Sequence, residues 1–317
     1  METVHYFNNI VITNLNILLA NIIMNVLIAI SSKHHSEPTL KAGMKVANAF
    51  SASSTVLEVG EKINEFSMKE VYMARERIES WNFDRPGVDV LEWAFNYLCK
   101  EKLINDSSIE RGFPKNTLVE NNSRRSEVFL EKGKAKNISL IIRNGDIIEE
   151  LRNEVQSGDY DVTVLGGSKS GNLSFDMVQY IESSIFIVKN FQTKKKNKIL
   201  LAVDSSKGSK KAIKHCVGIA NAFNIEVEII TVTQDVKLKK ANQNITEYAS
   251  KFLRRFNIKN KIIFEEGNPV DVIPKKAGND HILVIGSSSK GPLKTFFQSS
   301  TPIKILKKCN CPILVVK

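Results

Sequence analysis

An internal repeat constrains the fold of this chain more than any other feature of its sequence. The segment VLIAISSKHHSEPTLKAGMKVANAF (Val26–Phe50) aligns without a gap on ILLAVDSSKGSKKAIKHCVGIANAF (Ile199–Phe223), at an offset of 173 residues. Both copies pass from an apolar run through a polar turn into a segment with helical spacing. Such a repeat indicates two copies of one folding unit.

Further matches follow in the same order along both halves. NGDIIEEL (Asn144–Leu151) matches EGNPVDVI (Glu266–Ile273), VTVLGGSKSG (Val162–Gly171) matches ILVIGSSSKG (Ile282–Gly291), and IFIVK (Ile185–Lys189) matches ILVVK (Ile313–Lys317). We therefore divide the 317 residues into a first domain at 24–190, a basic linker at 191–198 and a second domain at 199–317.

Each half alternates short apolar runs with amphipathic segments. In the second half, KILLAV is followed by DSSKGS, whose Asp and Ser suit a helix N-cap, and then by a helix predicted from about Lys210 to Phe223. Strands that alternate with helices predict an α/β fold in which each half is a doubly wound, Rossmann-like parallel sheet. The continuous apolar run in ILVIG is typical of a strand buried on both faces.

The first half contains an extra stretch, at about 64–136. It includes Trp81, Trp93 and the amphipathic segment Val88–Ile104. Aromatic residues at helical spacing favour a helix that packs on its own domain. The alternative is an element that binds a partner or forms a lid.

Residues 1–23 precede the first repeat. Ile10–Ile30 is an uncharged run, but its end belongs to the first predicted strand, and the remaining apolar part is too short to cross a bilayer. A signal peptide is disfavoured because no Lys or Arg precedes Lys33. We expect a cytoplasmic protein without a membrane span, and our hypothesis is that Met24 is the biological start.

Composition argues against several other classes. The net charge of +11 is a reason to consider nucleic acid, but the basic clusters Lys194–Lys198, Lys237–Lys240 and Lys251–Lys261 come without an RNP, zinc-finger or KH signature. We interpret them as solvated surfaces and expect no nucleic-acid partner. The four cysteines are too few for a disulfide scaffold and lack metal-ligand spacing, so we expect reduced thiols and no metal site. They are Cys99, Cys216, Cys309 and Cys311.

Candidate ligand-binding residues gather at the predicted carboxyl ends of the strands in the second half, where doubly wound sheets bind their ligands. Two polar stretches, GSSSKG and QSSTP, offer hydroxyls and backbone N–H groups to an anion; the alternative is that they are polar turns without a ligand. The candidates are Asp204, Val232, Gly286, Ser288, Ser289, Gly291, Ser299, Ser300 and Thr301.

These stretches, in this order, resemble the universal stress protein family in its tandem two-domain form. The resemblance spans about 24–317 apart from the extra stretch, and it implies an adenine nucleotide (ATP, ADP or AMP) held at Asp204 and Val232. It also implies a phosphate loop of Gly, two residues, Gly, nine residues, Gly and then Ser or Thr. Here Ser289 and Ser299 stand at two of the glycine positions, and their side chains predict weak or vestigial binding.

The first half departs further from the family pattern. Ser31 stands where the second half has Asp204, Lys169 takes a glycine position, and the loop that should hold phosphates is shorter. We predict that this half does not bind nucleotide in the family's manner. The resemblance also implies that the domains pair through their last strands, Ile185–Val188 and Ile313–Val316.

We therefore predict a non-catalytic, regulatory stress-response protein with a weak adenine-nucleotide site in its second domain. The alternative is a nucleotide-free adaptor that binds a partner through the extra stretch. An ATP pyrophosphatase of a related fold is disfavoured because the loops SSKHHS and DSSKGS lack the glycines of an S-G-G-x-D-S loop. His34 and His35 have no nucleophile or paired carboxylates beside them in the sequence, so we interpret them as surface residues.

Overall fold

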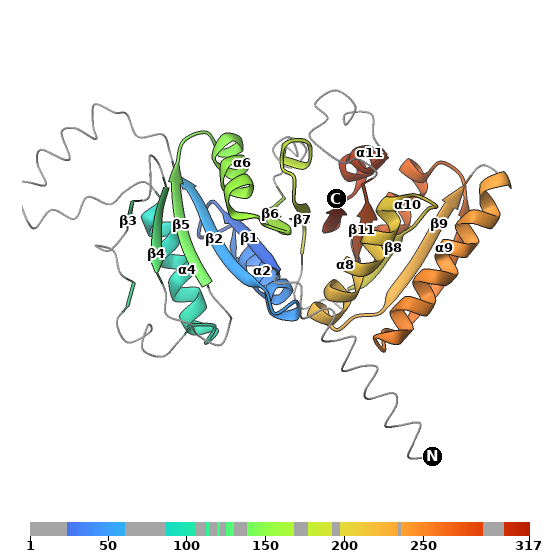
Figure 1. Ribbon diagram of the computed structural model, residues 1–317, viewed down its shortest axis with the longest axis horizontal. Helices are drawn as coiled ribbons and strands as arrows, with labels where there is room; N and C mark the ends of the chain where they lie inside the picture. Colours follow the sequence, from blue (N-terminus) through green and yellow to red (C-terminus); the bar gives the residue numbers. More distant parts are fainter. Residues whose placement is uncertain are drawn as a thin grey trace, which may run out of the picture.

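The computed structural model describes residues 24–60, 87–104, 112–113, 119–120, 125–129, 138–167, 177–191, 197–233, 236–287 and 301–317. The strands in these ranges form one sheet that runs through both halves of the chain (Figure 1). Its order is β10-β9-β8-β11-β12-β7-β6-β1-β2-β5-β4-β3.

The second half alternates strands and helices, as its sequence predicts. Its elements are β8 (Lys198–Ala202), α8 (Lys207–Phe223), β9 (Val227–Thr233), α9 (Val236–Arg255), β10 (Asn260–Glu266), α10 (Pro269–Ala277), β11 (His281–Gly286), α11 (Thr301–Lys308) and β12 (Ile313–Val316). All neighbouring strands within this half are parallel. The predicted α/β fold with a mostly parallel, doubly wound sheet is confirmed.

The first half repeats this order and adds two strands. Its elements are β1 (Asn25–Ile30), α2 (Glu37–Ala49), β2 (Ser53–Gly60), α4 (Val88–Lys100), β3 (Val119–Glu120), β4 (Arg125–Phe129), β5 (Ile138–Asn144), α6 (Ile147–Gly158), β6 (Val162–Gly166) and β7 (Ser184–Val188). Strands β3 and β4 extend the sheet beyond β5 in antiparallel pairing. The predicted parallel, doubly wound sheet of this half thus carries an additional antiparallel edge.

Helix α4 explains part of the extra stretch in the first half. It follows β2, as α9 follows β9, and packs on β2 and β5. Its buried face includes Leu91 and Phe95, and Trp93 packs against the same core. The interpretation as a helix that packs on its own domain therefore holds for α4. Trp81 lies outside the described residues.

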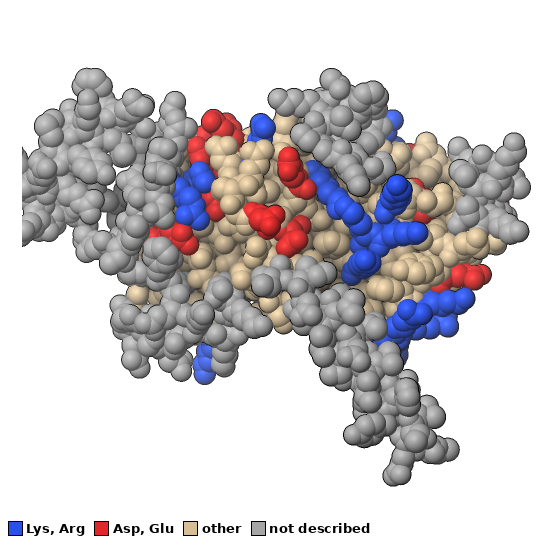
Figure 2. Space-filling model, in the orientation of Figure 1, with Lys and Arg blue, Asp and Glu red and all other residues tan. Residues whose placement is uncertain are grey.

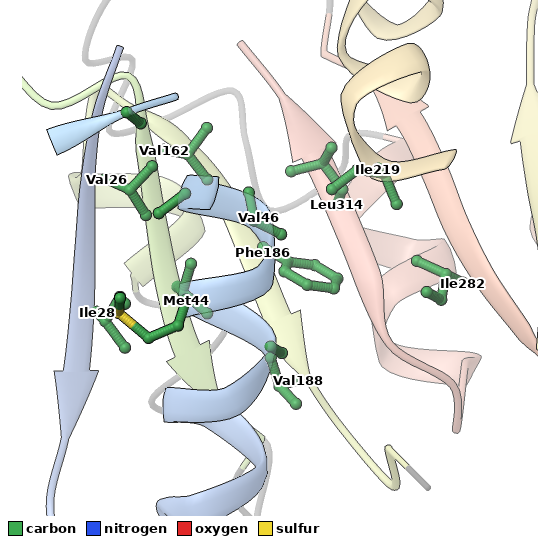
Figure 3. Close-up of a cluster of buried hydrophobic side chains, with 14 of the residues drawn as sticks. Val26, Ile28, Met44, Val46, Val162, Phe186, Val188, Ile219, Ile282 and Leu314 are labelled. Carbon is green, nitrogen blue, oxygen red and sulfur yellow. The ribbon is translucent and has the colours of Figure 1, made fainter. Parts of the chain in front are cut away.

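Two hydrophobic layers cover the faces of the sheet. One lies beneath α2, α4, α8 and α9, and the other beneath α6, α10 and α11. Where the two halves meet, Phe186 of β7 lies between Val46 of α2 and Leu314 of β12 (Figure 3). Because Phe186 and Leu314 are both buried, the first layer is continuous across the junction.

The junction itself is built from equivalent contacts made by each half. Strand β7 pairs antiparallel with β12, with Phe186 opposite Leu314. Lys189, after β7, donates from Nζ to the carbonyl of Cys309 at 2.9 Å. Lys317, after β12, donates from Nζ to the carbonyl of Ile181, the residue equivalent to Cys309. Each lysine thus places a cation at the carboxyl end of a helical turn in the other half, where the helix dipole favours positive charge.

None of the helices in the described ranges combines the length and the apolar character needed to span a membrane.

Candidate functional site

A hydrogen-bonded turn holds Asp204 just beyond the end of β8. Ser209 Oγ accepts from the backbone N–H of Asp204 at 2.9 Å and donates to Asp204 Oδ1 at 2.7 Å. The backbone N–H of Ser206 donates to the same Oδ1 at 3.0 Å. Oδ2 has no hydrogen-bond partner among the residues that the structure describes, and the side chain is exposed. The turn therefore presents a fixed carboxylate oxygen to solvent.

The first half contains the same turn without the carboxylate. Ser36, the equivalent of Ser209, accepts at Oγ from the backbone N–H groups of Ser31 and Ser32, at 3.0 and 3.1 Å. The serine is thus part of the turn in both halves. Asp204 is the feature that only the second half adds.

Val232 lies next to Asp204 at the end of β9. The ladder between β8 and β9 ends with a bond of 3.0 Å from the N–H of Val203 to the carbonyl of Ile230. Backbone groups of alternate residues point to the same side of a strand. Those of Val232, two residues after Ile230, therefore point to the β8 side, beyond the last residue of β8. Its side chain packs against the layer beneath α10 and α11.

Gly286 ends β11 at the same edge, and packing alone requires a glycine there. A Cβ on Gly286 would lie 2.3 Å from the backbone carbon of Gly208, and a Cβ on Gly208 would lie 2.6 Å from the carbonyl oxygen of Ser287. These two glycines let the end of β11 contact the first turn of α8 directly. A Cβ on Gly166, the equivalent of Gly286, would meet only Thr39 Oγ1, at 3.1 Å.

The remaining candidates are only partly placed. Thr301 is exposed and begins α11. Those that lie outside the described residues are Ser288, Ser289, Gly291, Ser299 and Ser300. The structure thus brings Asp204, Val232 and Gly286 to one edge of the sheet and does not place the predicted phosphate loop. In the described ranges, no three His, Cys, Asp or Glu side chains cluster as a metal site would require.

A buried carboxyl group in the first half escaped the sequence analysis. Glu58, near the end of β2, is 5% exposed, and Oε2 has no hydrogen-bond partner among the described residues. Burial and the nearby Asp89 raise its pKa to about 8. The equivalent residue of the second half, Thr231, donates to the carbonyl of Val203 at 2.8 Å. The alignment of the two repeats could have revealed this residue, because it pairs Glu58 with the neutral Thr231 inside an otherwise apolar strand.

The fold and this edge define a class of protein: a tandem doubly wound α/β protein whose candidate ligand site lies at the strand ends of its second half. The model of the Universal stress protein family matches residues 196–317. Universal stress protein MJ0577 of Methanocaldococcus jannaschii is 31% identical over 147 residues, which are 45% of this chain and 90% of that protein. Universal stress protein MJ0531 of the same organism is 29% identical over 139 residues, or 38% of this chain and 81% of that protein. The chain belongs to the universal stress protein family.

A solved structure extends the likeness in fold to both halves. The crystal structure of a universal stress protein from Archaeoglobus fulgidus matches with a TM-score of 0.58 and 15% identity, over 92% of this chain and 96% of that one. The relatives described above confirm the predicted family resemblance, and this structure confirms the expected fold over both halves.

Proposed function

We propose that this chain is a regulatory, non-catalytic member of its family that binds an adenine nucleotide weakly through its second half. One observation carries the proposal: the turn after β8 holds the carboxylate of Asp204 beside the backbone of Val232, which lies beyond the last pair of the β8–β9 ladder. The same turn in the first half has Ser31 at the position of Asp204 and therefore lacks the carboxylate.

The chemistry at this edge fits a nucleoside. A carboxylate accepts hydrogen bonds from ribose hydroxyls or from the adenine amino group. The backbone N–H and carbonyl of Val232 can pair with the donor and acceptor along the edge of an adenine ring. A phosphate group would extend toward the stretch between Gly286 and Thr301, where Ser289 and Ser299 replace glycine and weaken its binding.

We further propose that the two halves act as a built-in pair, with the first half supporting the second. The antiparallel pairing of β7 with β12 and the equivalent contacts of Lys189 and Lys317 support this proposal. Pairing within one chain also protects two sheet edges that would otherwise be open to association.

Calorimetry on protein stripped of nucleotide tests the proposed site. ATP and AMP should bind to the wild-type chain, Asp204→Ala should lose that binding, and the matched variant Ser31→Ala should keep it. Ser289→Gly with Ser299→Gly should tighten ATP binding. Absence of heat at millimolar ATP and AMP, in the wild type and the glycine variant alike, would overturn the proposal and favour the nucleotide-free adaptor.

A further inference from the structure

Helices α8 and α9 carry an unbalanced positive charge. They lie next to each other over one face of the second half's sheet (Figure 1). The one acid in either helix is Glu247. The basic residues on these helices whose side chains the structure describes are Lys207, Lys210, Lys211, Lys214, Lys251, Arg254 and Arg255.

The repeat supplies an internal comparison for this charge. The equivalent helices of the first half, α2 and α4, are balanced. Their charged residues are Lys41, Lys45 and Lys100 against Glu37, Asp89 and Glu92. The fold therefore does not require a basic surface at this place, and the excess is a property of the second half alone.

The flank of α8 that faces α9 can be read from its contacts with α2. The Phe50 ring, at the end of α2, lies 6.4 Å from the His215 ring of α8. The flank of α8 that carries His215 therefore faces α2. Successive residues of a helix turn by about 100°. Lys210 and Asn221 therefore lie on the opposite flank, toward α9, and both are exposed. Lys207 and Lys214 point away from the sheet, into solvent.

The facing flank of α9 carries aromatic rings. Ser250 bonds to Asn260 at the start of β10, on the side away from α8. By the same rotation, Tyr248 and Arg255 lie on the side toward α8. Tyr248 is 44% exposed, and its ring stacks on Phe252 with the ring centres 5.9 Å apart and the planes at 25°. An exposed aromatic platform thus lies between the lysines on the first turns of α8 and the basic end of α9.

The space-filling view shows how the positive charge is distributed over these helices. Lys and Arg side chains gather over α8 and again near the end of α9, with uncharged surface between them (Figure 2). At that end of α9, an open hollow of about 330 Å³ is lined by Arg254, Asn257, Ile258, Lys259 and Asn260. Within the described part of the chain, neither Arg254 nor Lys259 forms a salt bridge, so further positive charge lies past the end of the helix, on the side of α9 away from α8.

We propose that the surface between α8 and α9, lined by Lys210, Lys214, Tyr248 and Arg255, binds single-stranded nucleic acid. Single-strand sites combine a basic groove, which follows the phosphates, with aromatic rings on which unpaired bases stack. A duplex hides the faces of its bases, so the exposed Tyr248 ring favours a single strand. The sequence alone led us to interpret its basic clusters as solvated surfaces. The fold brings Lys251, Arg254 and Arg255 of one cluster onto the same face as the lysines of α8 and the stacked rings.

Fluorescence anisotropy with a labelled 20-nucleotide oligo-dT tests this inference on the full chain. If four phosphates are neutralised, raising the salt concentration fourfold should weaken binding about fifty-fold, from a slope of about −0.7 per phosphate. Lys210→Glu with Lys214→Glu should lower affinity at least about ten-fold. The matched control, Lys275→Glu with Lys304→Glu, makes the same change of charge on α10 and α11 over the opposite face and should bind like the wild type.

Tyr248 separates stacking from simple attraction between charges. Tyr248→Ala should lower affinity at least about five-fold, the low end for loss of one base stack, whereas Tyr248→Phe should retain it. Circular dichroism would confirm that each variant is folded. Three results would overturn the proposal: no binding at low salt, equal loss in the two charge variants, or full affinity in Tyr248→Ala. The last would indicate a surface for another polyanion, such as an acidic protein segment or an anionic membrane.

Discussion

Replacing Glu58 by glutamine should change how the stability of the protein depends on pH. Glu58 is buried at the end of β2, and its Cγ lies close to Gly87 at the start of α4. Burial, followed by the negative charge of Asp89, raises its pKa to about 8 from an ordinary value of 4.5. Glutamine has nearly the same shape and no proton to release, so Glu58→Gln isolates the titration.

The sign of the effect follows from where the proton is held. Between pH 4.5 and about 8, folded protein keeps the proton on Glu58 while unfolded protein releases it. The folded state thus binds more protons, and its stability falls as pH rises through this window. At 1.36 kcal/mol per pKa unit, the full shift corresponds to at most about 5 kcal/mol. About 3 kcal/mol of this should be lost between pH 5 and pH 8.

Urea unfolding at pH 5, 6.5 and 8, followed by circular dichroism, measures this loss. As pH rises from 5 to 8, the difference between the free energy of unfolding of Glu58→Gln and that of the wild type should shift by about 3 kcal/mol in favour of the variant. Glu154→Gln is the control. Burial alone would raise the pKa of Glu154, but hydrogen bonds from Arg125 and Arg143 outweigh it and lower that pKa. The amount by which the free energy of unfolding of Glu154→Gln falls below that of the wild type should not decrease as the pH rises. A difference between Glu58→Gln and the wild type that stays constant with pH would refute the reasoning.

Three further predictions concern packing. Gly286→Ala should destabilise the protein by about 1–3 kcal/mol, because the new Cβ meets the backbone of α8, while Gly166→Ala should cost under about 1 kcal/mol; equal midpoints in urea would contradict this. Phe186→Ala should cost about 3–5 kcal/mol in the same assay, because the ring is fully buried where the halves meet, and a loss under about 1 kcal/mol would be inconsistent with that burial. Complete burial raises the pKa of the Cys216 thiol, so iodoacetamide at pH 8 should label Cys216 only in urea, while Cys99 should react first in folded protein. Labelled Cys216 detected by mass spectrometry in the absence of urea would contradict this prediction.

The repeat made the fold predictable to a large extent. Two aligned copies fix the order of strands and helices twice over, and a parallel doubly wound sheet is the usual way to pack that order. Helix ends were less accurate. Helix α8 begins at Lys207, one turn earlier than the apolar spacing suggests, because Ser206 caps it by accepting from the N–H of Ser209. The spacing of apolar residues cannot reveal a first helical turn that is made of polar residues.

The antiparallel edge was not predictable from the same reasoning. Strand β4 has only five residues, and its apolar signal is short. It is held by pairing with β5 and by ion pairs of Arg125 with Glu127 and Glu154, at 2.8 and 3.0 Å. These contacts are tertiary, so the period of the local sequence does not reveal them.

The position of the candidate site was predictable from the sequence, but the role of each of its residues was less so. Asp204 and Val232 meet at one edge because parallel strands end there together. Gly286 was assigned to a ligand, yet its contact with Gly208 is sufficient to require glycine. Glu58 was missed because an acid in a strand is normally interpreted as exposed, and only the sheet shows that it is buried.

Comparison of the two halves separates residues that maintain the fold from residues that are free to differ. Equivalent residues make equivalent contacts at the junction, as Lys189 and Lys317 do, and in the turns held by Ser36 and Ser209. The halves differ instead at the strand ends and on the exposed faces of their helices. Since one scaffold accepts both versions, folding does not dictate these differences. The carboxylate of Asp204 and the basic surface of α8 and α9 are therefore the places where the proposed functions are best tested, because each can be removed by substitutions that leave the shared core intact.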